Sequence, residues 1–308
     1  MKLKISLAAL VLFLGMGAMA YAWGRLSETE QVYREGNAAY VELSEIVRGR
    51  AAYAPDRQTV RGVRPSGFED NNLYIGDNPL GAGEKYSEID GAVSGTGGQP
   101  AEKIIYTPEY DKQSTYLNAD IRCPVINFDA LKSVNGDAAA WLYCRDTLID
   151  YPVMKADDYN YYLHHLPDGR ENANGALFID YNCAPDFSGP LTVIYGHHMK
   201  SGSMFGSLTR YKEQSYFDLH PAMYLYTENG DYIIDLMYGC VIGSEQWRER
   251  AFMYAENIGS LLAYAARNTT FYSGAEYSED DRIIAMSTCS YEFEDARYVV
   301  IGVLREME

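Results

Sequence analysis

The sequence predicts a mainly β fold: a closed or nearly closed barrel of about eight strands, with a helix near the N-terminus and another late in the chain. From residue 124 onward, eight apolar, β-branched or aromatic runs are separated by turn residues. Asn229-Gly230, between the fifth and sixth runs, is typical of a tight β-hairpin. Eight strands with only peripheral helices favour a barrel, which removes exposed sheet edges. The predicted strands are 141–143, 151–154, 176–179, 191–195, 223–226, 232–242, 282–287 and 298–304.

Residues 1–24 differ from the rest of the chain and are predicted to form a transmembrane signal-anchor. Lys2 and Lys4 precede an uncharged stretch, 5–24, and twenty apolar helical residues span about 30 Å of bilayer. Lysines before this stretch, with acidic residues soon after it, place the N-terminus in the cytoplasm. The alternative is a cleaved signal peptide, because the segments 18–20 and 20–22 both resemble cleavage sites. The apolar run is longer than the usual hydrophobic region of a signal peptide and favours the anchor. Either way, the remainder is exported.

Two further segments precede the barrel. Residues 25–50 are predicted to be an N-terminal helix, since apolar residues recur at helical spacing and Ser27 with Glu30 makes a capping-box pattern. Residues 51–122 are rich in Gly, Pro, Tyr, Asp and Asn and show no sustained period. We predict that they form an irregular insert or stalk.

The last segment, 123–308, contains the predicted strands and two predicted helices. A short helix is expected over 127–134, and the late peripheral helix over 249–268, where apolar residues supply one buried face. The segment is therefore expected to be one β-barrel domain that carries the active site.

Charge and cysteine content limit the possible functions. The formal net charge is −17, with 26 Lys and Arg against 43 Asp and Glu, which argues against a nucleic-acid partner. Five cysteines in an exported protein leave at least one thiol outside an intramolecular disulfide. Cys240 lies in an apolar run and is expected in the core. Cys123, Cys144 and Cys183 could supply one disulfide, and the sequence does not select the pair.

The segment 283–304 is the most informative for chemistry. Cys289 ends one predicted strand, Arg297 begins the next, and a short acidic loop joins them. Antiparallel pairing would bring the two side chains together. A guanidinium favours the reactive thiolate and can hold a developing oxyanion. The spacing alone is weak evidence for a catalytic pair. A buried cysteine, together with a surface arginine that pairs with Glu294 or Asp295, would have the same spacing.

A second segment, 193–208, places a histidine pair after a strand. The strand ends at Tyr195, Gly196 turns the chain, and His197 and His198 follow in a loop. A histidine near a cysteine can supply general acid–base chemistry. The pair could equally bind a metal or be a surface feature, and the same dipeptide occurs at 164–165. A zinc site needs further ligands at matching spacing, and the sequence offers none, so no metal and no cofactor is predicted.

Taken together, these segments resemble the class B sortases of Gram-positive bacteria. The resemblance covers roughly residues 124–306, and its segments occur in the order found in the family. They are NFDALKSVNGDAAAWLYC (127–144), IDYPVM (149–154), YYLHH (161–165), GALFID (175–180), YGHHMKSGSMFGSL (195–208) and STCSYEFEDARYVVIG (287–302).

The resemblance implies an eight-stranded sortase-type barrel and a cysteine transpeptidase, or thiol endopeptidase, that needs no cofactor. Cys289 falls at the position of the family's nucleophile, His197 at that of its proton-transfer residue and Arg297 at that of its oxyanion stabiliser. Ser287 and Thr288 are expected to line the substrate pocket, although packing within the strand is their alternative role. His198 would then point away along the loop.

The resemblance also implies the partners. Sortases cut a C-terminal sorting signal of exported proteins after its threonine and pass the acyl group to an amine, either on the peptidoglycan precursor or on a pilin lysine. We therefore expect a single-pass membrane protein with an extracytoplasmic catalytic domain. A pilin-polymerising sortase is an alternative on the same scaffold. A non-catalytic surface binding protein is a third, opposed by the presence of all three catalytic residue types. Residues 51–122 exceed what the family usually has there.

Overall fold

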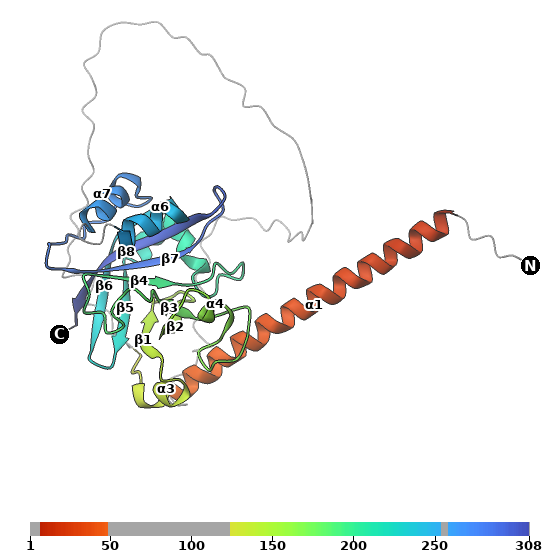
Figure 1. Ribbon diagram of the computed structural model, residues 1–308, viewed down its shortest axis with the longest axis horizontal. Coiled ribbons are helices and arrows are strands. Elements are labelled where there is room, and N and C mark those ends of the chain that lie inside the picture. Colours follow the sequence, from red (N-terminus) through yellow and green to blue (C-terminus); the bar gives the residue numbers. More distant parts are fainter. Residues whose placement is uncertain (1–6, 49–123, 254–257, 308) are drawn as a thin grey trace, which may run out of the picture. The chain divides into compact units, whose positions relative to one another are not determined.

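A closed barrel of eight strands forms the centre of the computed structural model, which describes residues 7–48, 124–253 and 258–307 (Figure 1). The order around the barrel is β1-β2-β3-β4-β7-β8-β6-β5. The pairs β2/β3 and β4/β7 are parallel, and the other six are antiparallel. The strands are β1 (Ala138–Tyr143), β2 (Asp150–Lys155), β3 (Leu177–Ile179), β4 (Leu191–Tyr195), β5 (Ala222–Thr227), β6 (Gly230–Gly243), β7 (Arg282–Cys289) and β8 (Ala296–Glu306).

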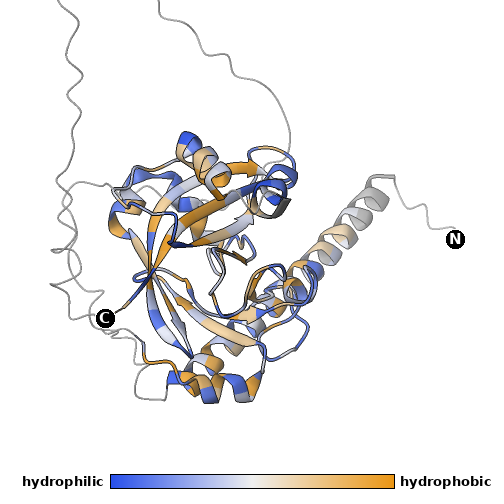
Figure 2. Cartoon of the chain, turned by 60° about the vertical axis from the view of Figure 1, so that its left-hand side comes forward, coloured by the Kyte–Doolittle hydropathy of each residue, from blue (hydrophilic) through white to orange (hydrophobic). Residues whose placement is uncertain are grey.

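This architecture confirms the predicted fold class. Each predicted strand occurs, and most extend by one to three residues beyond the predicted limits. The expected hairpin is also present, with Thr227 opposite Gly230 where β5 turns into β6. Figure 2 shows hydrophobic stretches along the strands and hydrophilic ones in the connecting loops, the distribution expected when a barrel buries its strands.

Helices lie before and between the strands. The short helix predicted over 127–134 is α3, and the side chain of Asn127 caps it by accepting from the Ala130 N–H at 3.0 Å. The late helix predicted over 249–268 differs: helical structure begins earlier, at Ser244, a π-helical turn follows, and α7 is a separate element after residues 254–257, which lie outside the described ranges. The helical elements are α1 (Leu7–Arg48), α3 (Phe128–Val134), α4 (Tyr161–His164), η1 (Gly206–Lys212), α5 (Gln214–Leu219), α6 (Ser244–Arg248), η2 (Glu249–Met253) and α7 (Ile258–Asn268).

The strands β7 and β8 are buried on both faces. In β7, Ile284 and Met286 belong to the cluster inside the barrel, whereas Ile283 and Ala285 belong to an outer cluster with Trp247 of α6. Successive strand residues point to opposite faces, so burial of both faces requires a continuous apolar run. The same alternation places Ser287 and Cys289 on the outer face, toward α6.

The N-terminal helix α1 runs unbroken from Leu7 to Arg48. The capping box predicted at Ser27 is therefore wrong, since Ser27 lies inside the helix: the apolar residues before it are themselves helical. Its C-terminal part packs on the barrel domain. The hydroxyl of Tyr40 donates to the Gly175 carbonyl at 2.5 Å, and Arg48 forms an ion pair with Asp150.

The structure describes only part of the predicted anchor, 1–24, and none of the predicted insert, 51–122. Within the part of the chain that the structure describes, no helix combines the length and the apolar character needed to cross a bilayer. Side chains of residues 1–14, which include much of the predicted anchor, lie outside that part, and so does the whole of the predicted insert 51–122.

The four cysteines in the described ranges are all free thiols. Cys240 is buried in the core, as predicted. Cys144 and Cys183 are unpaired, so the possible disulfide between these two is absent. Cys123 lies outside the described residues.

Candidate active site

The strand pair β7/β8 brings the candidate nucleophile and the candidate oxyanion donor together. Cys289, the last residue of β7, lies directly opposite Arg297 of β8, which confirms the predicted juxtaposition. The connecting loop closes through a hydrogen bond of 2.9 Å from the Ser290 N–H to the Ala296 carbonyl. Asp295 has a left-handed backbone with φ of 59°, a conformation in which Asp is enriched among non-glycine residues.

The histidine loop is held against β7 by backbone and hydroxyl contacts. Gly196 follows β4, its N–H reaches the Ser287 carbonyl at 3.3 Å, and its own carbonyl accepts from the Thr288 hydroxyl at 2.8 Å. A Cβ atom at Gly196 would lie 2.4 Å from the side chain of Leu177 and 2.7 Å from that of Phe205. A side chain at position 196 would have to displace these two neighbours. The close packing therefore fixes the backbone just before His197.

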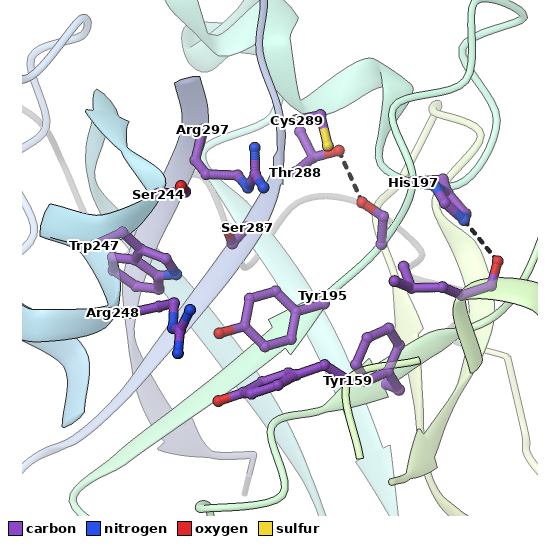
Figure 3. Close-up of a pocket in the computed structure, with 13 residues that line it drawn as sticks. Tyr159, Tyr195, His197, Ser244, Trp247, Arg248, Ser287, Thr288, Cys289 and Arg297 are labelled. Carbon is purple, nitrogen blue, oxygen red and sulfur yellow. Dashed lines mark hydrogen bonds between the residues drawn. The ribbon is translucent and has the colours of Figure 1, made fainter. Parts of the chain in front are cut away.

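His197 is half-buried and has one ring nitrogen engaged. Its Nε2 lies 2.8 Å from the carbonyl oxygen of Leu163. Because a carbonyl only accepts, Nε2 must carry the proton, and in the neutral ring Nδ1 is then an unprotonated acceptor. In Figure 3, Cys289 lies between Arg297 and His197 along one edge of the pocket that all three line. The geometry leaves Nδ1 as the nitrogen that can exchange a proton.

His198 takes a different position from the one expected. Its Nδ1 lies 2.8 Å from the backbone carbonyl of Cys289, and its ring centroid is 5.1 Å from that of Tyr291. The prediction that His198 points away along the loop is therefore wrong. The ring faces the backbone of the cysteine strand rather than the pocket, among whose lining residues it is absent. Local spacing could not reveal a contact between residues 91 positions apart.

The guanidinium of Arg297 donates hydrogen bonds to backbone carbonyl oxygens. Its Nη1 donates to the Ala296 carbonyl at 3.0 Å and more weakly to the Asp295 carbonyl at 3.5 Å. Within the described residues, neither Glu294 nor Asp295 forms an ion pair with it. The alternative reading of Arg297 as a loop salt bridge is therefore not what the structure shows. The remaining donors of the fork are available to a ligand.

The pocket beside these residues has a volume of about 340 Å³ and aromatic walls. Its lining residues include two arginines and a histidine but no Asp or Glu, in a chain whose net charge is −17. Such a site favours electron-rich groups, including peptide carbonyls. The walls come from several separate segments, and the sequence did not single them out: they are Tyr159, Leu163, Phe178, Tyr195, Ser244, Trp247 and Arg248.

Two of the pocket's polar groups behave differently. The Thr288 hydroxyl is committed to the Gly196 carbonyl. The Ser287 hydroxyl is buried and has no hydrogen-bond partner within the described chain. Tyr195 is tethered, since its hydroxyl donates to the buried Asp180 carboxylate at 2.9 Å, and burial together with that carboxylate raises the pKa of Tyr195. Both Ser287 and Thr288 line this pocket, and their role in substrate binding stays a prediction.

The other described thiols are poor nucleophiles. Burial raises the pKa of Cys144 and of Cys183 to about 11, and that of Cys240 to about 12. Each is therefore protonated near neutral pH, and the thiolate is the reactive form. Cys289 is partly exposed and lines the pocket. Among the described residues, no group of three His, Cys, Asp or Glu side chains is placed to hold a metal ion.

Comparison with known proteins agrees with this fold. The chain is 31% identical over 205 residues to sortase B of Listeria monocytogenes, a match that covers 66% of this chain and 81% of that protein. It is 24% identical over 178 residues to sortase B of Staphylococcus aureus, covering 57% and 73% of the two chains. No protein-family model matches the chain.

Solved structures show the same fold. A Staphylococcus aureus sortase B–substrate complex superposes with a TM-score of 0.55 at 23% identity, covering 59% of this chain and 86% of that one. Clostridium perfringens sortase B superposes with a TM-score of 0.54 at 24% identity, covering 58% of this chain and 100% of that one. The protein is a cysteine transpeptidase of the sortase type. More narrowly, the chain belongs to the sortase B family.

Proposed function

We propose that this transpeptidase cleaves a C-terminal sorting signal of exported proteins through a thioester on Cys289 and transfers the acyl group to an amine, which anchors those proteins to the cell wall. The observation that carries the proposal is the meeting of Cys289, Arg297 and His197 at one pocket that contains no carboxylate. The solved substrate complex of the Staphylococcus aureus relative supports a substrate bound in this fold.

Substrate binding comes first. The peptide lies in the pocket with the carbonyl of its threonine toward Arg297, whose fork still has free N–H donors. The Ser287 hydroxyl, buried without a partner in the described chain, gains a hydrogen bond from a peptide group of the substrate. An unpaired buried hydroxyl is costly, so this bond contributes to binding. Thr288 instead holds the histidine loop against β7.

Acylation follows. The Cys289 thiolate attacks the threonine carbonyl carbon, forming a C–S bond and an oxyanion that Arg297 stabilises. The oxyanion collapses, the scissile C–N bond breaks, and the leaving amine takes a proton from the His197 imidazolium. That proton comes from Nδ1, because Nε2 remains bonded to Leu163. The products are a thioester and a released C-terminal peptide.

Transfer reverses the proton path. The incoming amine attacks the thioester carbonyl and gives a proton to Nδ1 of His197, after which the C–S bond breaks and the thiolate is restored. The acceptor amine belongs to the peptidoglycan precursor, and a pilin lysine is the alternative. Supplying each acceptor to the acylated enzyme and measuring its consumption distinguishes the two.

The test uses a fluorogenic sorting-signal peptide. Cys289→Ala is expected to abolish cleavage and transfer, because the acyl group has no other thiol at the pocket. Cys183→Ala is the matched control: its half-buried thiol lies outside this pocket and should be dispensable. Retention of more than a trace of activity by Cys289→Ala would refute the mechanism, provided that both variants melt like the wild type.

Membership of the sortase B family suggests an extracytoplasmic catalytic domain. We propose residues 1–24 as its membrane anchor, supported by the uncharged stretch 5–24 after Lys2 and Lys4. Fractionation of cells that produce the full chain tests this. Recovery of a trimmed soluble product that begins near residue 21 would show a cleaved signal peptide instead.

A further inference from the structure

The loop that joins Cys289 to Arg297 gains little stability from burial of its side chains. Residues 291–295 are all exposed, and Tyr291 and Phe293 have 75% and 51% of their surface open. A segment with so few apolar contacts would ordinarily open at low cost in free energy. Its conformation must therefore be held by specific polar contacts, and any motion of this loop moves the strand ends that carry both active-site residues.

Backbone hydrogen bonds hold the loop at its β8 end, including one from the Ser244 N–H to the Asp295 carbonyl at 3.0 Å, and Lys212, the last residue of η1, holds it at its β7 end. Its Nζ donates to the Ser290 hydroxyl oxygen at 3.1 Å and forms an ion pair with Glu292. The Ser290 hydroxyl in turn donates to Glu292. The ammonium also lies 5.2 Å from the ring centroid of Tyr298, the β8 residue paired with Thr288 of β7. We call Lys212, Ser290 and Glu292 the loop clamp.

The loop clamp is electrically balanced. Burial opposes ionisation of Glu292, but hydrogen bonds from Lys212 and Ser290 outweigh it and lower the pKa to about 2. The carboxylate is thus charged at any physiological pH and compensates the ammonium. A compensated pair exerts a weak field on a neighbouring thiol. Its effect on Cys289 is mechanical, through the adjacent residue Ser290.

The loop clamp also connects the two halves of the active site. The segment that carries His197 continues directly into η1, and the Phe205 N–H at its end donates to the His197 carbonyl at 3.0 Å. Lys212 closes η1 and reaches across to the loop after Cys289. The clamp therefore adds a side-chain contact beyond Cys289 to those that Gly196 and His198 make with the end of β7.

We propose that Lys212 is a positioning residue, which through Ser290 and Glu292 holds Cys289 in line for attack on the substrate carbonyl. The proposal rests on the proposed function, in which Cys289 is the nucleophile. Misplacing a reacting atom by about 1 Å can cost on the order of 100-fold in rate. Most of the pocket wall that would contact the peptide, including Tyr159, Tyr195 and Trp247, lies outside β7 and β8, so the loss should fall mainly on kcat rather than on KM.

Three variants of the full chain test this. Lys212→Met keeps the stem and removes the charge, Glu292→Gln keeps an acceptor and removes the charge, and Lys212→Arg restores both a cation and several donors. Lys132→Met is the matched control, since Lys132 makes a comparable half-exposed ion pair with Glu228 away from the pocket. For each protein, kcat and KM on the fluorogenic peptide, the alkylation rate of Cys289 by iodoacetamide and the melting temperature are measured.

We expect Lys212→Met and Glu292→Gln to lower kcat by about 10- to 100-fold with KM within about twofold, as for loss of alignment. Lys212→Arg should recover most of kcat, and Lys132→Met should leave it unchanged. The alkylation rate should not fall with kcat in both clamp variants, because Lys212→Met leaves a negative charge and Glu292→Gln a positive one beside Cys289, with opposite effects on thiolate formation, whereas both lose the alignment. If Lys212→Met does not fold, Glu292→Gln carries the same test.

A kcat within about twofold of wild type in both clamp variants would overturn the proposal. So would an equal loss in Lys132→Met, or an alkylation rate that falls in step with kcat, which would mean that Lys212 acts on thiol ionisation. Failure of the proposed function appears elsewhere, in the wild-type protein: complete alkylation of Cys289 would then leave peptide cleavage intact.

Discussion

Replacement of Arg297 by lysine separates a catalytic role from a structural one. Nη1 of the guanidinium donates a hydrogen bond to the Ala296 carbonyl at 3.0 Å, and the other N–H donors remain available to the pocket. An ammonium on a shorter, rotating stem cannot hold that carbonyl and the substrate oxyanion with the same fixed fork. Lysine therefore keeps the charge of Arg297 and loses its geometry.

The expected magnitude follows from the oxyanion interaction. Loss of one such donor typically costs about 100- to 1000-fold in kcat, or about 3–4 kcal/mol of transition-state stabilisation. We expect Arg297→Lys to lose nearly as much activity as Arg297→Ala. Both should melt close to the wild type, because the described structure gives Arg297 no ion pair to lose.

The assay is steady-state cleavage of a fluorogenic sorting-signal peptide, with thermal melts of the same preparations. Arg248→Lys is the comparison variant: Arg248 lines the same pocket from α6 without a part in the proposed bond-making, so any loss there should fall on KM and not on kcat. The reasoning is refuted if Arg297→Lys keeps most of its kcat while both Arg297 variants lower the melting temperature, the pattern of a residue that only stabilises its loop.

Three other predictions follow from the same geometry. His197→Ala should lose at least about 100-fold in kcat, as for a general acid–base residue. His198→Ala should lose distinctly less, and comparable losses in the kinetics of the two single variants would reject the assignment of His197. Glu292 has a folded-state pKa lowered from 4.5 to about 2, so its ion pair with Lys212 contributes stability fully above about pH 4.5 and loses it as pH falls toward 2. The melting temperatures of wild type and Glu292→Gln should therefore converge across that window, and a constant difference would contradict this. Gly196→Ala should destabilise the fold by about 1–3 kcal/mol through overpacking, measured by denaturant unfolding; an unchanged midpoint would show that the loop has room.

The strands were predictable because their signal is local. Each is an apolar run bounded by turn residues, and burial of β7 and β8 on both faces explains why theirs are continuous. Cys289 and Arg297 were found because the register of one hairpin places them opposite each other. His197 was assigned by family resemblance, which supplied the long-range information that its spacing lacks.

The features that the sequence did not disclose depend on contacts between distant segments. The pocket walls Tyr159, Tyr195 and Trp247 come from three separate elements, and no local pattern joins them. The pair formed by Lys212 and Glu292 spans 80 positions. The wrong helix start has another cause: residues 7–26 contain no proline, and their many Leu, Ala and Met residues favour a helix despite three glycines, so α1 continues through Ser27.

Capture of the acyl-enzyme tests the central claim most directly. The wild-type protein is incubated with a sorting-signal peptide in the absence of an amine acceptor, quenched in acid and examined by intact and peptide mass spectrometry. The account predicts a mass increase equal to the N-terminal part of the peptide, located on Cys289, discharged by added amine and absent from Cys289→Ala. An adduct on Cys144, Cys183 or Cys240, or cleavage that continues in Cys289→Ala, would contradict it.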